Sequence, residues 1–212
     1  MSDYDSRSPA RRPLDHVEFG PGLDSRTDRR LIGDARGRRV LDLGCGAGHT
    51  AVGLALRGAR VIATDQDAGQ LFSARALAAD HGVAVEFHEA HPAELAFISA
   101  DQIDVAVSVW SLSLVDDLDR VLRQVHRVLR SPGHLIMSLP HPAVLCADPT
   151  DASRTVRSWA DPGPIDERFV HTAEGVITSL GRTNFSVDTL LERQTDGLMP
   201  NTLVVRARKL GT

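Results

Sequence analysis

The residues best placed to do chemistry lie in a glycine-rich segment at positions 40–49, VLDLGCGAGH. A short apolar run, residues 39–43, leads directly into Gly44, Gly46 and Gly48. Glycine lets the backbone turn tightly and lets a ligand lie against it without a Cβ in the way. Asp42 adds a carboxylate two residues before the first glycine. That carboxylate would repel an anionic pyrophosphate and attract a cationic ligand.

A second carboxylate, Asp65, ends the next apolar run, residues 60–64. A carboxylate at such a strand end can accept both hydroxyls of an adenosine ribose. Two adenosine ligands use this geometry, dinucleotides and S-adenosylmethionine. The spacing GxGxG in place of GxGxxG, together with Asp42, favours S-adenosylmethionine, whose sulfonium and ammonium are both cationic. An NAD-linked oxidoreductase is an alternative that Asp42 disfavours.

The elements that must position these residues follow from the apolar periodicity. It predicts strands at 39–43, 60–64, 83–87, 103–109, 134–139, 186–192 and 202–209, and helices at 25–33, 50–57, 68–81, 117–130 and 172–182. Alternating strands and helices predict an α/β fold with a mostly parallel sheet and helices on both faces. Ligands of such sheets bind at the carboxyl ends of the strands, so the site is expected in the loops that follow them.

The length of 212 residues predicts one domain with four parts. We expect an N-terminal arm that acts as a lid (1–30), a cofactor-binding core (31–140), a proline-rich excursion on the substrate side (141–171) and a C-terminal part that completes the sheet (172–212).

The composition excludes several classes of function. The net charge of −4 argues against a general nucleic-acid binder, and six Phe, two Trp and one Tyr provide few rings for base stacking. The apolar runs are far shorter than the roughly 18 residues that a membrane span needs. The N-terminus lacks the apolar segment of a signal peptide, so we expect a cytoplasmic protein in which Cys45 and Cys146 are reduced.

Taken in order, the motifs resemble those of the class I S-adenosylmethionine-dependent methyltransferases, and most closely the small actinobacterial members related to the ubiquinone/menaquinone and "type 11" group. The resemblance rests on VLDLGCGAG (40–48), VIATD (61–65), AELAF (93–97) before IDVAVS (103–108), and VLRQVHRVLRSPGHLIMSLP (121–140). It covers residues 23–140, and SLGRTNFSVDTLLE (179–192) and PNTLVVRARK (200–209) echo the family more loosely. It implies a Rossmann-like, seven-stranded sheet whose last strand is antiparallel. It also implies S-adenosylmethionine as cofactor and S-adenosylhomocysteine as product.

The resemblance further implies a set of cofactor contacts. The methionine and ribose side would be lined by Asp42, Gly44, Cys45, Gly46 and Gly48, with Ser108 and Val109 facing the methionine part through their backbones. Asp65 would hold the ribose hydroxyls, Gln66 would flank the adenine, His91 and Pro92 would approach the adenine edge, and Phe19 would close over the cofactor. The family usually has Gly-Asp where this chain has Ala90-His91, and a neutral imidazole could replace that carboxylate as an acceptor. Pro92 lacks an N–H, which removes a backbone donor.

Methyl transfer from a sulfonium depends on positioning and on a dry site, and it needs a base only where the acceptor keeps its proton. His141 follows the fifth predicted strand, in LPHP, and is the first candidate to touch the substrate or act as base; a structural histidine in a proline turn is the alternative. His171 is the second candidate. The H-E-x-H spacing of His88, Glu89 and His91 differs from the zinc-binding H-E-x-x-H, so no metal site is expected.

The expected function is methyl transfer to a small-molecule acceptor at O, N or C. Two alternatives stay open. The departures at His91, Pro92 and Ser113 would suit a non-catalytic or regulatory partner protein with a methyltransferase fold. An arginine stripe would suit an RNA methyltransferase, although neighbouring aspartates make a solvated face the simpler interpretation; it consists of Arg120, Arg123, Arg127 and Arg130. A homodimer also stays open.

Overall fold

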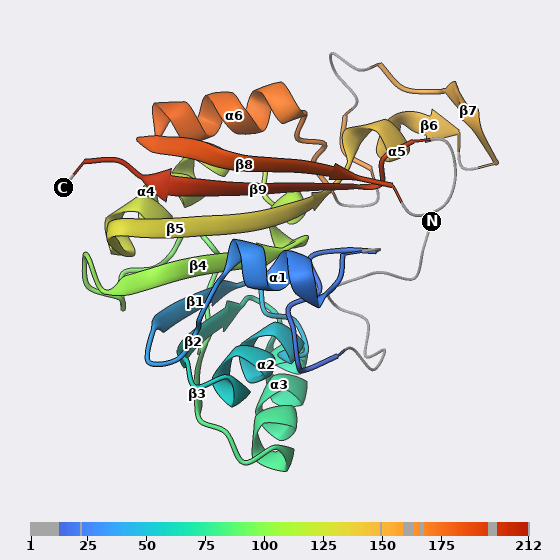
Figure 1. The fold of residues 1–212 in the computed structure, drawn as a ribbon. Helices are drawn as coiled ribbons and strands as arrows, with labels where there is room; N and C mark the ends of the chain where they lie inside the picture. The colour runs from blue at the N-terminus through green and yellow to red at the C-terminus, as the bar shows by residue number, and fades with distance from the viewer. Residues whose placement is uncertain are drawn as a thin grey trace.

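The structure is a computed structural model that describes residues 13–21, 23–148, 150–158, 163–165, 168–194 and 199–211 (Figure 1). A seven-stranded sheet has the order β3-β2-β1-β4-β5-β9-β8. Its strands are β1 (Arg39–Leu43), β2 (Arg60–Asp65), β3 (Val85–Glu89), β4 (Ile103–Val109), β5 (Leu129–Pro140), β8 (Phe185–Arg193) and β9 (Thr202–Lys209). The strands β1 to β5 pair in parallel, and β9 runs antiparallel to both β5 and β8. The predicted fold class, a mostly parallel Rossmann-like sheet with an antiparallel last strand, is confirmed.

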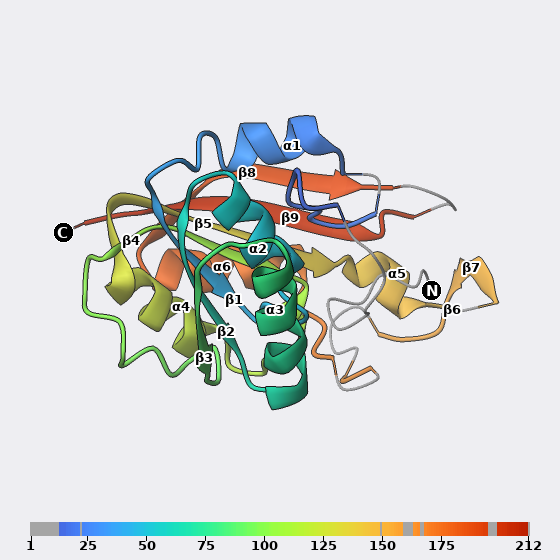
Figure 2. The same ribbon diagram turned by 90° about the horizontal axis from the view of Figure 1, so that it is seen from below.

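Helices cover both faces of this sheet. The helices α1 (Ser25–Leu31), α2 (His49–Leu56) and α3 (Ala68–Asp80) contribute to one hydrophobic cluster, and α4 (Leu118–Val128) and α6 (Ala173–Arg182) contribute to the other. Figures 1 and 2 show α1 and α6 on opposite sides of β5, β8 and β9. The alternation of side chains along a strand explains both clusters: in β5, Leu135, Met137 and Leu139 join the α4 side, and Ile136 joins the α1 side. Among the described residues, no helix is long and apolar enough to cross a membrane.

The structure differs from the sequence predictions at several places, including the end of α4 at Val128 and the start of β5 at Leu129. The strand expected at 83–87 begins at Val85, because Gly82 adopts a left-handed φ of 64° and the Val83 N–H still bonds to the Ala78 carbonyl at the end of α3. The 141–171 excursion is only partly irregular, since it contains α5 (Pro142–Cys146) and a hairpin of β6 (Ala147–Asp148) and β7 (Asp151–Thr155). A 3₁₀ helix, η1 (Ser111–Leu114), follows β4 and was not predicted.

The described part of the N-terminal arm packs into the core. Val17, Phe19 and Leu23 are at most 4% exposed. A Cβ on Gly20 would lie 2.7 Å from the Thr202 side chain of β9, and a Cβ on Gly53 of α2 would lie 2.7 Å from the Leu14 carbonyl. The arm therefore crosses from α2 to β9 in close contact with both. Its predicted role as a lid stays a prediction, and residues 1–12 and 22 lie outside the described residues.

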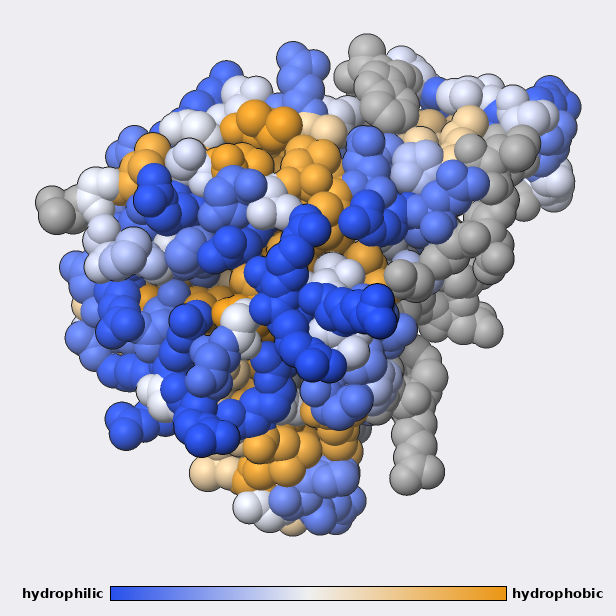
Figure 3. Space-filling model, in the orientation of Figure 1, coloured by the Kyte–Doolittle hydropathy of each residue, from blue (hydrophilic) through white to orange (hydrophobic). Residues whose placement is uncertain are grey.

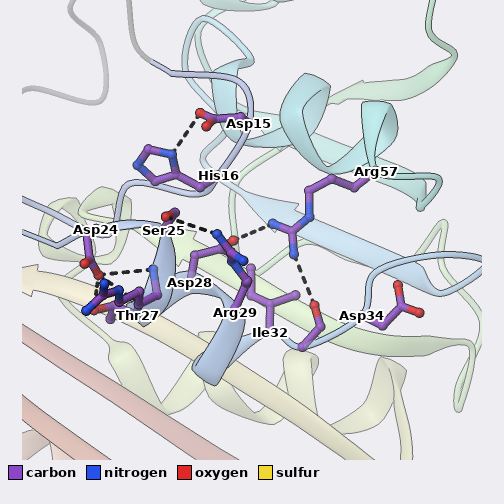
Figure 4. A network of polar contacts seen from close by, with 12 residues as sticks. Asp15, His16, Asp24, Ser25, Thr27, Asp28, Arg29, Ile32, Asp34 and Arg57 are labelled. Carbon is purple, nitrogen blue, oxygen red and sulfur yellow. Dashed lines mark hydrogen bonds and ion pairs between the residues drawn. The ribbon is translucent and has the colours of Figure 1, made fainter.

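An ion pair fastens α1 to the end of α2 (Figure 4). Asp28 is 1% exposed, and its Oδ2 lies 2.6 Å from Nη1 of Arg57, the residue that caps α2. Arg57 Nη2 also donates to the Gly33 carbonyl at 3.1 Å, just beyond α1. The Asp24 carboxylate begins α1 by accepting from the backbone N–H groups of Arg26 and Thr27. Helix α1 is thereby held at both ends.

Candidate active site

The glycine loop connects β1 to α2 at the carboxyl edge of the sheet. Gly44, Gly46 and Gly48 have φ values of 68°, 53° and 87°, a left-handed region that favours glycine. A Cβ on Gly44 would overlap the Ser111 side chain of η1, and a Cβ on Gly48 would lie 2.7 Å from Ala74 Cβ of α3. Two of the three glycines thus serve close packing of neighbouring elements against the loop. The sequence had suggested a ligand in that space.

Asp65 is held against the glycine loop at the end of β2. Gly46 N–H donates to Asp65 Oδ2 at 2.8 Å, and Asp67 N–H donates to Oδ1 at 3.0 Å. A carboxylate has about four acceptor sites, so these two bonds leave capacity for a ligand. Asp67 itself caps α3 by accepting from Gly69 and Gln70 N–H groups.

A cavity of about 120 Å³ lies between this carboxylate and the loops after β3 and β4. It is lined by Gly44, Asp65, Gln66, Asp67, His91, Pro92, Ser111, Leu114 and Val115. Five predicted site residues, Gly44, Asp65, Gln66, His91 and Pro92, are therefore brought together. Ser111, Leu114 and Val115 were not predicted to belong to the site. Their position directly after β4, at the same edge, was the signal that could have found them.

Asp42 lies beneath the loop with 1% exposure. Burial, and then the negative charge of Asp65, raises the pKa of Asp42 to about 7, while a hydrogen bond with the Ala51 backbone acts in the opposite direction. Within the described part of the chain, Asp42 Oδ2 has no hydrogen-bond partner. A buried carboxylate with an unsatisfied oxygen would be stabilised in its ionised form by a cation bound nearby.

The other predicted contacts of the methionine side are mostly buried in the protein. Burial raises the pKa of the Cys45 thiol, as do the charges of Asp42 and Asp65, so Cys45 is an inert packing residue. Ser108 Oγ lies 2.6 Å from Ser111 Oγ, and the Ser111 hydroxyl donates to the Leu43 carbonyl at 2.5 Å. These bonds join the ends of β1 and β4. Val109 is 5% exposed, and Phe19 is fully buried in the same cluster as Cys45.

The predicted catalytic histidines already make hydrogen bonds within the protein. His141 caps α5: its Nδ1 accepts from the Ala143 N–H at 3.0 Å, and its Nε2 lies 3.0 Å from Glu192 Oε1. In that tautomer Nε2 carries the proton, so neither nitrogen can take one from a substrate. His171 Nε2 donates to the Val115 carbonyl at 2.9 Å, and burial lowers the pKa of His171.

His91 presents a donor where the sequence predicted an acceptor. Its Nδ1 accepts from the Ala93 N–H at 3.1 Å, so the proton of the neutral ring is on Nε2. That edge can donate to a ring nitrogen of adenine but cannot accept from the adenine amino group. The geometry of the loop, not the residue type, determines this difference.

Known proteins share this fold and these motifs. Residues 41–137 match a family described as a methyltransferase domain. The ubiquinone biosynthesis O-methyltransferase of Pseudomonas syringae pv. tomato is 34% identical over 102 residues, 48% of this chain and 44% of that protein. That of Aeromonas salmonicida is 34% identical over 116 residues, 55% of this chain and 48% of that protein. The chain thus spans about half the length of these curated relatives.

Solved structures extend the likeness beyond the central motifs. An S-adenosylmethionine-dependent methyltransferase from Mesorhizobium loti is 25% identical with a TM-score of 0.73, covering 93% of this chain and 100% of that one. A 1,6-didemethyltoxoflavin-N1-methyltransferase from Burkholderia thailandensis was solved with 1,6-didemethyltoxoflavin and S-adenosylhomocysteine. It is 23% identical with a TM-score of 0.62, and the match covers 86% of this chain and 75% of that one. Residues 41–137 thus match the methyltransferase-domain family, and the chain as a whole shares its fold with S-adenosylmethionine-dependent methyltransferases.

Proposed function

We propose that this chain binds S-adenosylmethionine at the carboxyl edge of the sheet and transfers its methyl group to a small-molecule acceptor. The observation that carries the proposal is the cavity in which Gly44, Asp65, Gln66 and His91 meet. The relatives support it by name, since they are methyltransferases that act on small molecules such as 1,6-didemethyltoxoflavin.

The residues present suit this cofactor chemically. The spare acceptor sites of Asp65 match the two ribose hydroxyls, and the His91 Nε2–H matches an adenine ring nitrogen. The unsatisfied oxygen of Asp42 gains a favourable partner when a cation binds nearby. A dinucleotide would instead bring a pyrophosphate toward two carboxylates, which disfavours the NAD-linked alternative.

S-adenosylmethionine supplies an electrophilic methyl group on its sulfonium. The protein's own part in the transfer is to position the acceptor in line and to exclude water. The excursion is tied over η1 by the Phe169 N–H, which donates to the Ser113 carbonyl at 2.7 Å, and by the bond from His171 to Val115. Both nitrogens of His141 are engaged in hydrogen bonds, so we assign His141 a positioning role. The methyl acceptor then loses its proton without His141 acting as the base.

Hydroxyl acceptors are the first to test, because the curated relatives are O-methyltransferases. We assign the acceptor pocket to the N-terminal arm and the excursion after β5. The contacts of Phe19, Ser108 and Val109 with the cofactor, a homodimer and a cytoplasmic location are further parts of this proposal.

Isothermal titration calorimetry with S-adenosylmethionine and S-adenosylhomocysteine tests the proposal. The wild type should bind both, and Asp65→Ala should weaken each by about thirtyfold, because two hydrogen bonds of about 1 kcal/mol are lost. Asp80→Ala removes the same charge from the exposed end of α3 and is the matched control, with no expected effect. Absence of binding at millimolar concentrations would contradict the proposal. Binding without turnover on hydroxyl, amine and carbon acceptors would favour the non-catalytic alternative.

A further inference from the structure

A second concave region lies at the opposite edge of the sheet, where the parallel strands begin. It is a cavity of about 390 Å³ beneath the end of α1. Arginines from four separate parts of the chain converge on it, and we call it the arginine pocket; its lining is Arg30, Arg38, Arg130, Arg206, His134, Asp104 and the apolar Leu31, Ile32, Val105 and Pro132, with Gly33. It shares no lining residue with the cavity beside Asp65.

The position of the arginine pocket separates it from the cofactor site. Arg38 immediately precedes β1, whereas Gly44 immediately follows it. The five residues of β1 span roughly 16 Å at the rise of a β-strand, so the two cavities are at opposite ends of the strand. In Figure 3, hydrophilic side chains cover much of the face around α1.

The charge of the arginine pocket is unbalanced. Four guanidinium groups line it, and Asp104 is its one lining carboxylate among the described residues. Asp104 is already engaged by Arg130 and by the Arg39 N–H at 2.7 Å. Arg206 Nη1 is paired with a second carboxylate, Asp188, which lies outside the lining at 3.5 Å. This positive excess stands out in a chain whose net charge is −4.

Two further observations support an anion site in the arginine pocket. Among the residues that the structure describes, the buried Arg206 Nε has no hydrogen-bond partner. The pKa of His134 is lowered, first by burial and then by the neighbouring Arg206, with smaller contributions from Arg38 and Arg208, against the opposing effect of Asp188. The Nε–H of Arg206 is thus available to an acceptor, and a bound anion would relieve the repulsion of His134 by the neighbouring arginines.

We propose that the arginine pocket binds the phosphate group of a small molecule. Planar guanidinium groups form paired hydrogen bonds with phosphate oxygens, and several of them together select a doubly charged anion. The apolar wall of Leu31, Ile32, Val105 and Pro132 offers contact area for a carbon skeleton. A concave pocket of this kind favours a small molecule over a nucleic-acid backbone, which binds along an extended basic surface.

Calorimetry at low ionic strength with pyrophosphate and with ribose 5-phosphate as separate probes tests this proposal, because neither probe carries the adenine expected at the cofactor site. The wild type should bind at least one probe with a dissociation constant below about 1 mM. Tighter binding of pyrophosphate indicates an inorganic ligand, and tighter binding of ribose 5-phosphate indicates an organic phosphate; either supports the site. The double variant Arg38→Gln/Arg206→Gln should weaken binding of the probe at least about tenfold. Arg30→Gln, at an exposed position, provides a second variant that leaves the core contacts intact and should weaken binding less.

Arg123→Gln is the charge-matched control, because Arg123 is exposed on α4, on the opposite face of the sheet. It should leave binding unchanged. The proposal is overturned if neither probe binds at about 5 mM, a level at which even weak phosphate sites respond. It is equally overturned if Arg123→Gln reduces binding as much as the double variant, or if a single-stranded RNA binds and both small probes fail. None of these readouts depends on the methyltransferase activity.

Discussion

Replacing Asp42 by asparagine removes the most strongly perturbed carboxylate of the candidate site. The folded state raises the pKa of Asp42 from 3.8 to about 7, because the carboxylate is buried and faces the charge of Asp65. The folded protein therefore binds a proton at Asp42 more tightly than the unfolded chain does. Stability must fall as the pH rises from about 4 toward 7, since the unfolded state can ionise there and the folded state cannot.

The size of this effect follows from the shift. At pH 8 the full displacement of about three pKa units costs about 4 kcal/mol, whereas at pH 5 less than half of that cost applies. The asparagine amide has no such pH dependence, although its burial introduces a constant cost of about 1–3 kcal/mol. The difference in unfolding free energy between Asp42→Asn and the wild type should therefore increase by about 2–3 kcal/mol between pH 5 and pH 8.

Urea unfolding of both proteins at pH 5, 6.5 and 8, without cofactor, measures this difference directly. The comparison across pH cancels the constant cost of the amide. Asp80→Asn supplies an exposed control, for which the difference should stay within about 0.5 kcal/mol. A difference for Asp42→Asn that is flat across this range would refute the inference that Asp42 is a desolvated, protonatable carboxylate.

The same reasoning applies to the cofactor. If a cation binds beside Asp42, binding ionises the carboxylate and releases a proton below about pH 7. Calorimetry in two buffers of different ionisation enthalpy should detect this proton for the wild type and not for Asp42→Asn. Equal proton release by both proteins would exclude Asp42 as its source.

Three further predictions concern single contacts. Gly44→Ala should destabilise the protein by at least about 2 kcal/mol more than Gly37→Ala in thermal unfolding, because both glycines have positive φ but only Gly44 has a neighbour, Ser111, in the space of the added Cβ; equal losses would contradict the packing role. Arg57→Ala should cost about 3 kcal/mol in urea unfolding, since it leaves the buried Asp28 carboxylate without its ion pair, and a loss below about 1 kcal/mol would show that the pair does not anchor α1. His141→Ala should cost about 1 kcal/mol for the lost cap of α5 and leave the pH profile of methyl transfer unchanged, whereas loss of a titration near neutral pH would identify His141 as a base.

Much of the fold could be predicted because each strand and helix carries its own local signal. The apolar run before Gly44 and the amphipathic pattern of α4 each identify their element without reference to the rest of the chain. The elements that were missed lack such a signal. Residues 111–114 read SLSL and form η1 because Trp110 takes a left-handed φ of 61° after β4, and Ser111 then bonds to the end of β1. That conformation depends on contacts between distant segments.

Only part of the lining of the candidate cavity could be predicted from the sequence. Gly44 and Asp65 are among the predicted residues that line it, whereas Ser111, Leu114 and Val115 were missed. The hydrogen-bond direction at His91 depends on the Ala93 N–H, and the burial of Phe19 depends on how the arm packs against the sheet, neither of which residue type reveals. The arginine pocket was also not visible, because its four arginines are dispersed between positions 30 and 206.

The binding of the cofactor at the carboxyl edge is tested most directly by a crystal structure of the chain with S-adenosylhomocysteine. We expect the ribose hydroxyls within hydrogen-bond distance of the Asp65 carboxylate, the adenine beside Gln66 and His91, and the homocysteine chain over Gly44. A ligand bound at any other edge of the sheet, or a ribose without contact to Asp65, would contradict this binding mode.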